Sequence, residues 1–479
     1  MTVLAIDQGT SSTKAVVVSD GGDVLGIAEE PVRPAYLAGG GVEQDPAQLL
    51  SSVLTAGRRA IAEAGQPVST VSIANQGETV LVWDPDTGTP LSPAVVWQDR
   101  RAEAFCRSKT GDRDWVRQRT GLVLDCYFSA PKMRWLRRNA TTAGVVTTSD
   151  TWLVHQLTGE FVTDAATASR SLLTDLDTMA WDPQLLELFE LSSERLPAIV
   201  ANDAVVGATA AFGSSAMVGG LIVDQQAALL AQRCLAPGTA KCTFGTGVFL
   251  LANVGTKGLR PTSGLTCSLA WNLRDANSYC IDGQCYTAAS AIRWIQDLGL
   301  IAAPSDLDVV AADDPGGTFF VPALAGLAAP WWRPDASASF TGMTLSTNRS
   351  QLVTAVLQGL AAQTAELVSA IEGDLSAPLS TLRVDGGLTR SRRLMQATAD
   401  LTQIPIEVYP SSHATALGAA ACARMAADPA LSVADAVPDW TPATTYHPQW
   451  SADRAADFRH HWRAAVTATL PPEKAAEDS

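Results

Sequence analysis

The sequence contains no Cys-x-x-Cys pair, although eight of its 479 residues are cysteine. Scattered cysteines give little support to a zinc site or a redox-active dithiol. We expect these thiols to be reduced, as is usual in the cytoplasm. The five histidines are also dispersed, except for the adjacent pair His460 and His461, which cannot share one face of a helix. Neither residue type therefore predicts a metal cluster.

Basic residues are scarce, since 34 Lys and Arg stand against 49 Asp and Glu, for a net charge of −15. This balance argues against nucleic acid and against an anionic membrane as partners, because both require clustered positive charge. No apolar run approaches the roughly 20 residues of a membrane helix, and no signal peptide is visible at the N-terminus. We therefore expect a cytoplasmic protein, and the length favours two large domains.

Three nucleotide-binding or catalytic motifs are missing. There is no GxxxxGK[ST] motif, which excludes a P-loop, and no GxGxxG after the first apolar run, which disfavours a dinucleotide-binding fold. A GxSxG nucleophile elbow is also absent, so a serine hydrolase has no support. Any phosphate site must be built differently.

The N-terminus, MTVLAIDQGTSSTKAVVV, predicts a β-hairpin. Strands are expected at 3–6 and 15–18, with Asp7, Gly9, a row of hydroxyl residues and Lys14 between them. Backbone N–H groups and hydroxyls in such a turn can bind an anion. Further along, the pattern predicts a strand at 24–30, a helix at 46–64 and a strand at 71–77.

The pattern restarts near residue 234. A strand at 239–243, the turn FGTG and the run VFLLANV repeat the layout of the N-terminus, and 382–403 reads as strand, glycine turn and helix. We therefore expect two similarly built α/β halves. From spacing alone, the three turns DQGTSST, FGTG and DGG are equally compatible with anion binding and with ordinary hairpins.

Three acidic residues stand where a strand gives way to another element. Asp224 ends the apolar strand LIVD, a position suited to a general base that accepts a proton from a hydroxyl, or alternatively to a helix N-cap. Asp7 is suited to a metal-bound water. Glu78 follows NQG and is read either as a polyol ligand or as a solvated turn residue.

With these residues in view, the sequence resembles the FGGY carbohydrate kinases, and within them the glycerol kinases. The segments that carry the resemblance, in chain order, are IDQGTSSTKAVV, ANQGETVLVWDPDTGTPLSPAVVWQDRR, TGLVLDCYFSAPKMRWL, TSDTWLVHQLTG, DAATASRSLL, VDQQAALLAQ, KCTFGTGVFLL, LAGLAAPWWRPDASASFTGMT and VDGGLTRSRRLMQ. The resemblance implies an α/β fold of two actin-like ATPase (ribonuclease H-like) domains, 1–232 for the polyol and 233–479 for the nucleotide, with ATP and Mg²⁺ in the cleft between them. It leaves open a homodimer or a homotetramer.

The resemblance also assigns roles residue by residue. Asp224 matches the catalytic base, and Asp7 and Asp224 match the metal site. The positions that match polyol contacts are Gly77, Glu78, Trp97, Tyr127, Asp224, Gln225 and Phe249. The positions that match ATP contacts are Thr10, Ser11, Ser12, Lys14, Thr246, Ala289, Arg293, Gly387 and Ser391. At four of these, the family usually has another residue: Arg for Lys14, Gly for Ala289, Gln for Arg293 and Asn for Ser391.

One departure concerns the substrate. The family's Asn-Gln-Arg-Glu-Thr is Asn75-Gln76-Gly77-Glu78-Thr79 here, so the arginine that would hold glycerol is missing. We expect poorer binding of glycerol and room for a four- or five-carbon polyol. Alternatively, another side chain or a water fills the gap and the substrate is glycerol. A non-catalytic sugar or polyol sensor on the same fold is a further alternative, although a sensor has no need of a base.

Overall fold

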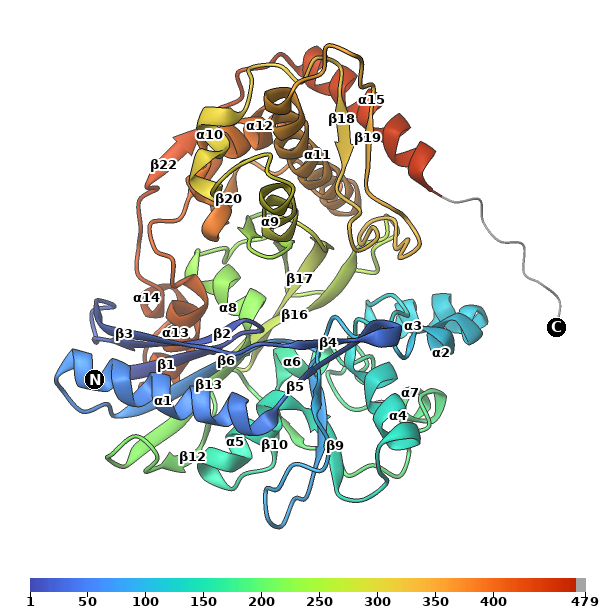
Figure 1. Cartoon of the computed structure of the whole chain (residues 1–479). Helices are drawn as coiled ribbons and strands as arrows, with labels where there is room; N and C mark the ends of the chain where they lie inside the picture. Colours follow the sequence, from blue (N-terminus) through green and yellow to red (C-terminus); the bar gives the residue numbers. More distant parts are fainter. Residues whose placement is uncertain (471–479) are drawn as a thin grey trace.

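Two large β-sheets organise the chain in the computed structural model, which describes residues 1–470 (Figure 1). The first sheet has six strands in the order β12-β13-β6-β1-β2-β3. Their bounds are β1 (Val3–Gln8), β2 (Ser12–Val18), β3 (Val24–Pro31), β6 (Thr70–Asn75), β12 (Val205–Thr209) and β13 (Ala216–Val223). β1 pairs antiparallel with β2 and parallel with β6, and β6 pairs parallel with β13. The carboxyl ends of β1, β6 and β13 therefore meet at one edge.

The N-terminal hairpin forms as its sequence predicts. Asp7 lies opposite Lys14 in the register, and the Gly9 N–H donates to the Ser12 carbonyl across 3.0 Å. Apolar residues bury both faces of β1, since Leu4 and Ile6 pack into one core cluster and Val3 and Ala5 into another. The predicted strands at 3–6, 15–18, 24–30 and 71–77 and the helix at 46–64 are all present.

The second sheet repeats this arrangement. Its seven strands have the order β16-β17-β15-β14-β20-β21-β22, and β14 pairs antiparallel with β15 and parallel with β20, as β1 does with β2 and β6. The expectation of two similarly built halves is thus confirmed. The strands are β14 (Ala240–Phe244), β15 (Val248–Gly255), β16 (Thr266–Leu273), β17 (Ala276–Cys285), β20 (Leu382–Asp385), β21 (Ile406–Val408) and β22 (Thr444–Tyr446).

Helices cover both faces of the first sheet, and one of them comes from late in the sequence. α1 (Pro46–Ala64) contacts β1, β2 and β3, whereas α13 (Ala414–Ala427) contacts β1, β6, β13 and α8 (Asp224–Ala231). Figure 1 shows α13, in orange-red, beside the blue strands β1 and β2. Small residues permit this packing, because a Cβ at Gly418 would lie 1.9 Å from the Ala227 carbonyl oxygen. The predicted boundary between residues 232 and 233 divides the sequence. By sequence α13 belongs to the second half, but it packs on the sheet of the first half.

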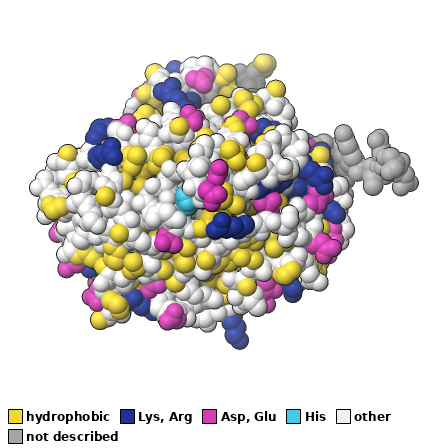
Figure 2. Space-filling view, turned by 90° about the horizontal axis from the view of Figure 1, so that it is seen from below, with side chains coloured by type: hydrophobic (Ala, Val, Ile, Leu, Met, Phe, Trp, Pro, Cys, Tyr) yellow, Lys and Arg dark blue, Asp and Glu magenta, His cyan; other side chains and the backbone are white. Residues whose placement is uncertain are grey.

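The longest helix, α11 (Arg349–Leu375), is apolar enough and long enough to cross a membrane, but 83% of its most apolar window is buried inside the protein. It packs beside α12 (Arg392–Thr402), β15 and β17 in the core of the second half. We therefore read α11 as a core helix. Basic and acidic side chains are interspersed on the face of the molecule that Figure 2 shows.

The remaining elements frame these two sheets. A five-stranded sheet and two short pairs consist of β4 (Ala35–Leu37), β5 (Gly41–Gln44), β7 (Val80–Trp83), β8 (Ala94–Val95), β9 (Val145–Thr148), β10 (Val162–Asp164), β11 (Ala198–Val200), β18 (Phe319–Val321) and β19 (Ser339–Thr341). The other α-helices are α2 (Glu103–Ser108), α3 (Arg113–Thr120), α4 (Ser129–Asn139), α5 (Ser149–Thr158), α6 (Ala165–Ser169), α7 (Pro183–Leu188), α9 (Ala289–Asp297), α10 (Leu307–Val310), α14 (Val433–Ala436) and α15 (Ala452–Thr469). The 3₁₀ turns are Ala38–Gly40, Thr110–Asp112, Pro304–Asp306 and Gly387–Arg390.

Candidate active site

A cavity of about 200 Å³ lies where the two sheets approach each other, and both halves of the chain contribute to its wall. The hairpin turns after β1 and β14 both reach it, as does the carboxyl end of β13. Ten residues predicted from the sequence line this cavity: Thr10, Ser11, Gly77, Glu78, Trp97, Tyr127, Asp224, Gln225, Thr246 and Phe249. Those that do not line it are Asp7, Ser12, Lys14, Ala289, Arg293, Gly387 and Ser391.

Asp224 stands at the first position of α8, directly after β13. The N-cap residue of α8 is Val223, and the Asp224 carboxylate accepts a hydrogen bond from the Gln225 N–H to Oδ1 at 2.7 Å, not from the N–H two or three residues farther along that an N-cap would bind. The alternative of a helix N-cap therefore receives no support. Burial raises the pKa of Asp224, and the nearby positive charge of Lys241 opposes that rise. The result is a carboxylate at the cavity wall, suited to accept a proton.

Lys241 is a fully buried lysine on β14. Its Nζ donates to Gln225 Oε1 at 2.5 Å and to Thr243 Oγ1 at 2.9 Å. Thr243 Oγ1 in turn donates to Asp385 Oδ1 at 2.5 Å. Lys241 thus fixes the side chain of Gln225 beside Asp224 and places one positive charge near two carboxylates, Asp224 and Asp385. The sequence analysis missed it, although a lone charge inside an apolar strand was the available signal.

The first hairpin turn is held by side chains from the first half. Thr10 Oγ1 accepts a hydrogen bond from Trp97 Nε1 at 2.9 Å and donates one to Gln76 Oε1 at 3.1 Å. Gln44 Nε2 donates to the Thr10 carbonyl at 2.7 Å. Ser12 instead donates to Glu29 Oε1 at 2.6 Å and lies outside the cavity wall. Thr10 and Ser11 therefore remain at the cavity, whereas the hydroxyl of Ser12 is engaged on β3.

Glu78 has an unusual backbone conformation for a buried, non-glycine residue, with a φ of 59°. The Thr79 N–H donates to the Gly77 carbonyl at 2.8 Å and closes a tight turn around it. Residues held in sparsely populated backbone regions cluster at functional sites. Burial raises the pKa of Glu78, and Arg170 opposes the rise. The structure therefore excludes the alternative of a solvated turn residue.

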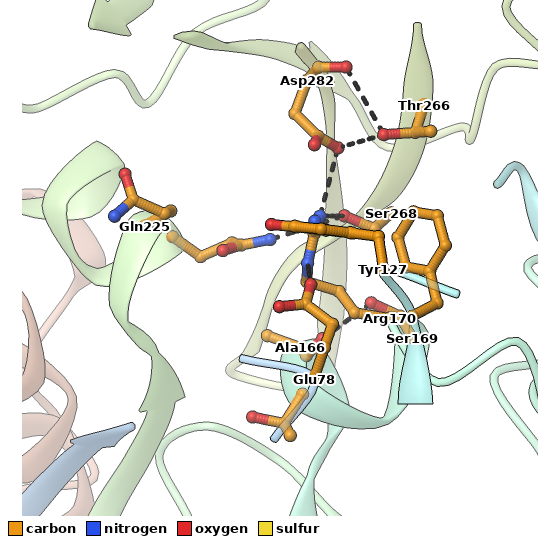
Figure 3. Close-up of polar contacts among 12 residues, drawn as sticks. Glu78, Tyr127, Ala166, Ser169, Arg170, Gln225, Thr266, Ser268 and Asp282 are labelled. Atoms are coloured by element: carbon orange, nitrogen blue, oxygen red, sulfur yellow. Dashed lines mark hydrogen bonds and ion pairs between the residues drawn. The ribbon is translucent and has the colours of Figure 1, made fainter. Parts of the chain in front are cut away.

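Arg170 follows α6 and lies between Glu78 and Asp282 (Figure 3). Its Nε donates to Glu78 Oε1, and its Nη1 donates to Asp282 Oδ1 at 3.1 Å and to Ser268 Oγ at 3.3 Å. Both acidic side chains and Arg170 are less than one-tenth exposed. Buried charges are retained in proteins where they are paired in this way. An arginine of the first half is thereby joined to β16 and β17 of the second half.

Aromatic rings form the remaining wall. Trp97 meets Tyr127 and Phe249 edge-on, with centroid distances of 5.7 Å and 5.9 Å. The loop that bears Tyr127 is fixed by the buried Lys132, whose Nζ donates to the carbonyls of Cys126, Tyr127 and Phe128. Apolar ring faces combined with a few polar groups are typical of sites for small polar molecules.

Comparison with known proteins identifies the family. Models described as the N-terminal and C-terminal domains of the FGGY family of carbohydrate kinases match residues 2–231 and 240–427. The chain belongs to the FGGY family of carbohydrate kinases. A glycerol kinase of Bordetella parapertussis is 39% identical over 488 residues, covering 97% of this chain and 96% of that protein.

Solved structures agree with this assignment. A glycerol kinase of Plasmodium falciparum, crystallised with ADP, has a TM-score of 0.89 at 31% identity and covers 98% of each chain. A ligand-bound xylulose kinase of Lactobacillus acidophilus has the same TM-score at 19% identity over 98% of each chain, which shows a shared fold. The predicted fold of two actin-like ATPase domains is therefore confirmed. The FGGY kinases use ATP, and this chain is a phosphotransferase with an alcohol group as acceptor.

The residues predicted on the adenine side lie apart from the cavity. Ser391 is the N-cap of α12 and donates its hydroxyl to Asp308 Oδ1 at 2.7 Å, so this hydroxyl is already used within the protein. The Ala289 N–H, at the start of α9, donates to the Gly245 carbonyl at 3.0 Å, and Arg293 is exposed. A Cβ at Gly387 would meet no atom within 4 Å, so this turn borders open space. Their contacts with ATP remain predictions.

The cavity contains an arginine from outside the motif at Gly77. Gly77 stands where the family has arginine, and Arg170 lines the same cavity. A Cβ at Gly77 would lie 3.0 Å from Val223 Cγ2 and 4.0 Å from Arg170 Nε, so a side chain at this position would begin between Val223 and Arg170. The sequence analysis quoted Arg170 within DAATASRSLL without giving it a role. Asp282 and Gln226, which also line the cavity, were missed as well.

Proposed function

We propose that this kinase transfers the γ-phosphoryl group of ATP to a terminal hydroxyl of a small, neutral polyol of four or five carbons. The observation that carries the proposal is Gly77, which lines the cavity together with Glu78 and Arg170 and presents no side chain to the substrate there. The cavity wall contains three carboxylates, Glu78, Asp224 and Asp282, against one arginine. This excess of negative charge favours an uncharged polyol over a sugar acid.

Asp224 would act as the general base. In an in-line transfer, a bond forms between the substrate oxygen and the γ-phosphorus while the bond from that phosphorus to the bridging oxygen of ADP breaks. The proton of the attacking hydroxyl passes to Asp224. Gln225, held by Lys241, would orient the same hydroxyl, and Glu78 and Tyr127 would bind its neighbours. The hairpin turns at Thr10, Ser11 and Thr246 would face the phosphates with backbone N–H groups.

Asp7 and Asp224 would hold Mg²⁺ together with the phosphates. Burial and, after it, the charge of Asp224 raise the pKa of Asp7 to about 7, and Lys14 opposes the rise; a cation bound beside the two carboxylates would favour their charged forms. Within residues 1–470, no group of three or more His, Cys, Asp or Glu side chains forms a complete metal site. This fits Mg²⁺, which usually takes one or two carboxylates plus substrate phosphates. When bound, the ion would neutralise charge on the transferred group.

Glycerol is the second candidate substrate, and Arg170 is the observation in its favour. Its guanidinium is a charged donor close to the position that Gly77 vacates, and it already orients Glu78. A relative that is 39% identical is named glycerol kinase, although the name belongs to that protein. Because Arg170 is committed to Glu78, Ser268 and Asp282, we rank a longer polyol first.

A coupled ADP-release assay over glycerol, tetritols, pentitols, ketopentoses and sugar acids tests the proposal. We expect the highest kcat/KM for one tetritol or pentitol, and we expect Gly77→Arg to shift preference toward glycerol. Gly77→Ala is the control, because its Cβ needs only a small shift of the Val223 methyl group. If glycerol is the best substrate of the wild type, the second candidate is correct.

The need for ATP also leads us to infer a cytoplasmic location. The eight cysteines are buried and free, as is usual for reduced cytoplasmic thiols.

A further inference from the structure

Asp282 reaches the cavity from the second half of the chain. It lies on β17, and both of the donors that it meets bind the same oxygen: Arg170 Nη1 at 3.1 Å and Thr266 Oγ1 at 2.8 Å, each to Oδ1 (Figure 3). Within residues 1–470, Oδ2 receives no hydrogen bond. Asp282 therefore presents one uncommitted carboxylate oxygen in a residue that lines the cavity.

Gln226 supplies a second unused acceptor. It is fully buried, it lines the same cavity, and its Nε2 donates to Ser268 Oγ at 3.4 Å. Its Oε1 has no hydrogen-bond partner in the part of the chain that the structure describes. Leaving a buried acceptor unsatisfied is unfavourable, so such a group in a cavity wall points to a ligand that donates.

Asp282 lies on the far side of Arg170 from Glu78, and Gln226 donates to Ser268, the residue that also accepts from Arg170 Nη1. Arg170 uses Nε for Glu78 and Nη1 for Asp282 and Ser268, and Figure 3 shows Glu78 and Asp282 on opposite sides of the guanidinium. Glu78 belongs to the part of the site matched by glycerol-contacting positions. Asp282 therefore lies where a longer substrate would extend.

We propose that Asp282 and Gln226 form a distal subsite that accepts hydrogen bonds from the hydroxyl groups of carbons beyond the third. This inference rests on the proposed function and names the residues that determine chain length. A carboxylate oxygen and an amide oxygen both accept, so the subsite takes alcohol O–H groups and rejects a substrate that ends in a carboxylate. A longer polyol would also contact both halves of the enzyme, whereas Glu78, Tyr127 and Asp224 all belong to the first half.

Asp282→Asn tests the subsite at one atom. Arg170 and Thr266 both donate to Oδ1, so the amide must keep its oxygen there and place its NH₂ where Oδ2 was. The free acceptor becomes a donor while the Arg170 contact remains. We expect the ratio of kcat/KM for the best tetritol or pentitol to that for glycerol to fall by about 10-fold or more, the scale of one lost hydrogen bond to a charged group.

Thr266→Val is the matched control, because it removes the other donor to Oδ1 and leaves the free oxygen in place. It should leave that ratio within about 2-fold of the wild type. The proposed subsite is wrong if Asp282→Asn leaves this ratio unchanged. That result would be seen if kcat/KM falls equally for both substrates or falls for neither. The wild-type ranking separately decides the proposed function, because preference for glycerol would refute the proposed substrate whatever the variant does.

Asp282→Glu covers the possibility that the amide variant does not fold. It keeps the negative charge for Arg170 and carries the carboxylate one methylene farther into the cavity, where the distal carbons would lie. We expect the same ratio to fall, with pentitols losing more than tetritols. If Asp282→Glu is folded and keeps the wild-type ratio, the distal carbons do not lie beside residue 282 and the inference is wrong.

Discussion

Lys241 Nζ donates to Gln225 Oε1 across 2.5 Å and so joins the first strand of the second half to the start of α8, one residue beyond Asp224. The lysine is fully buried, and it carries a positive charge that opposes the burial-driven rise in the pKa of Asp224. Lys241 therefore acts on Asp224 through its charge and through the position of Gln225, although Lys241 itself does not line the cavity.

Lys241→Met should lower kcat by about 10-fold and move the acid limb of the kcat–pH profile to higher pH. Without the positive charge, the pKa of Asp224 rises further, and the carboxylate form is reached only at higher pH. The profile of kcat measured at saturating ATP and polyol checks this. Lys132→Met is the control, because Lys132 is a second buried lysine that binds only backbone carbonyls. An acid limb that stays in place in Lys241→Met would show that the lysine has a purely structural role.

Asp224→Asn should reduce kcat by roughly 10²-fold or more, the usual scale for a lost general base, while ATP and polyol still bind. Steady-state kinetics together with calorimetry of each ligand separate the two effects. Asp45→Asn is the matched acid-to-amide control, since Asp45 caps α1 through the Ala47 N–H and does not line the cavity. If kcat barely changes in Asp224→Asn, this carboxylate is not the base.

The sequence predicted the parts of the site that depend on local pattern. Apolar runs on either side of a glycine turn predicted the hairpins at Thr10 and Thr246, and an acid at the end of an apolar strand predicted Asp224. These residues meet because the carboxyl ends of neighbouring parallel strands lie at one edge of a sheet. The resemblance to the FGGY kinases then supplied Glu78, Tyr127, Gln225 and Phe249, which line the same cavity.

The ion pairs that Arg170 forms with Glu78 and Asp282 could not be predicted from local sequence pattern. Arg170 finds Glu78 and Asp282 at separations of 92 and 112 residues, so their pairing is decided by how the halves pack. The available signal was a lone charge within a small or apolar run, as in ATASRSLL, AKCTF and YCIDGQC, because such a charge must find a partner when it is buried. The placement of α13 on the first sheet is likewise a consequence of packing between distant segments.

Asp7→Asn should stabilise the protein more at pH 8 than at pH 4. The pKa of Asp7 is about 7 in the folded protein, against an ordinary value of 3.8. Below pH 4 both states carry the proton, so burial has little cost. As the pH rises from 4 to 7, the unfolded chain ionises while the folded protein holds its proton, and stability falls. The amide removes this penalty.

Denaturant unfolding of the ligand-free enzyme at the two pH values measures the effect. The gain in unfolding free energy should be at least about 1 kcal/mol larger at pH 8 than at pH 4. Asp23→Asn, on the exposed turn between β2 and β3, controls for the loss of one negative charge. Equal gains at both pH values for Asp7→Asn would mean that Asp7 is not protonated in the folded protein, contrary to the raised pKa that burial gives it.

The hydrogen bond from Trp97 Nε1 to Thr10 Oγ1 joins the first hairpin turn to the aromatic wall of the cavity. Thr10→Val removes the acceptor for Trp97 Nε1 and the donor for Gln76 Oε1, so the KM values of both ATP and polyol should rise, each by about 3- to 10-fold. Trp97→Phe keeps an aromatic ring but removes the donor, so it should raise the KM of the polyol and leave that of ATP near the wild type.

Because the two changes delete the same hydrogen bond, the double variant should lose no more polyol affinity than Thr10→Val alone. Thr10→Ser, which keeps the hydroxyl, should behave like the wild type. If the two single losses in polyol affinity add fully in the double variant, Thr10 and Trp97 act independently and the hydrogen bond between them does not position the wall.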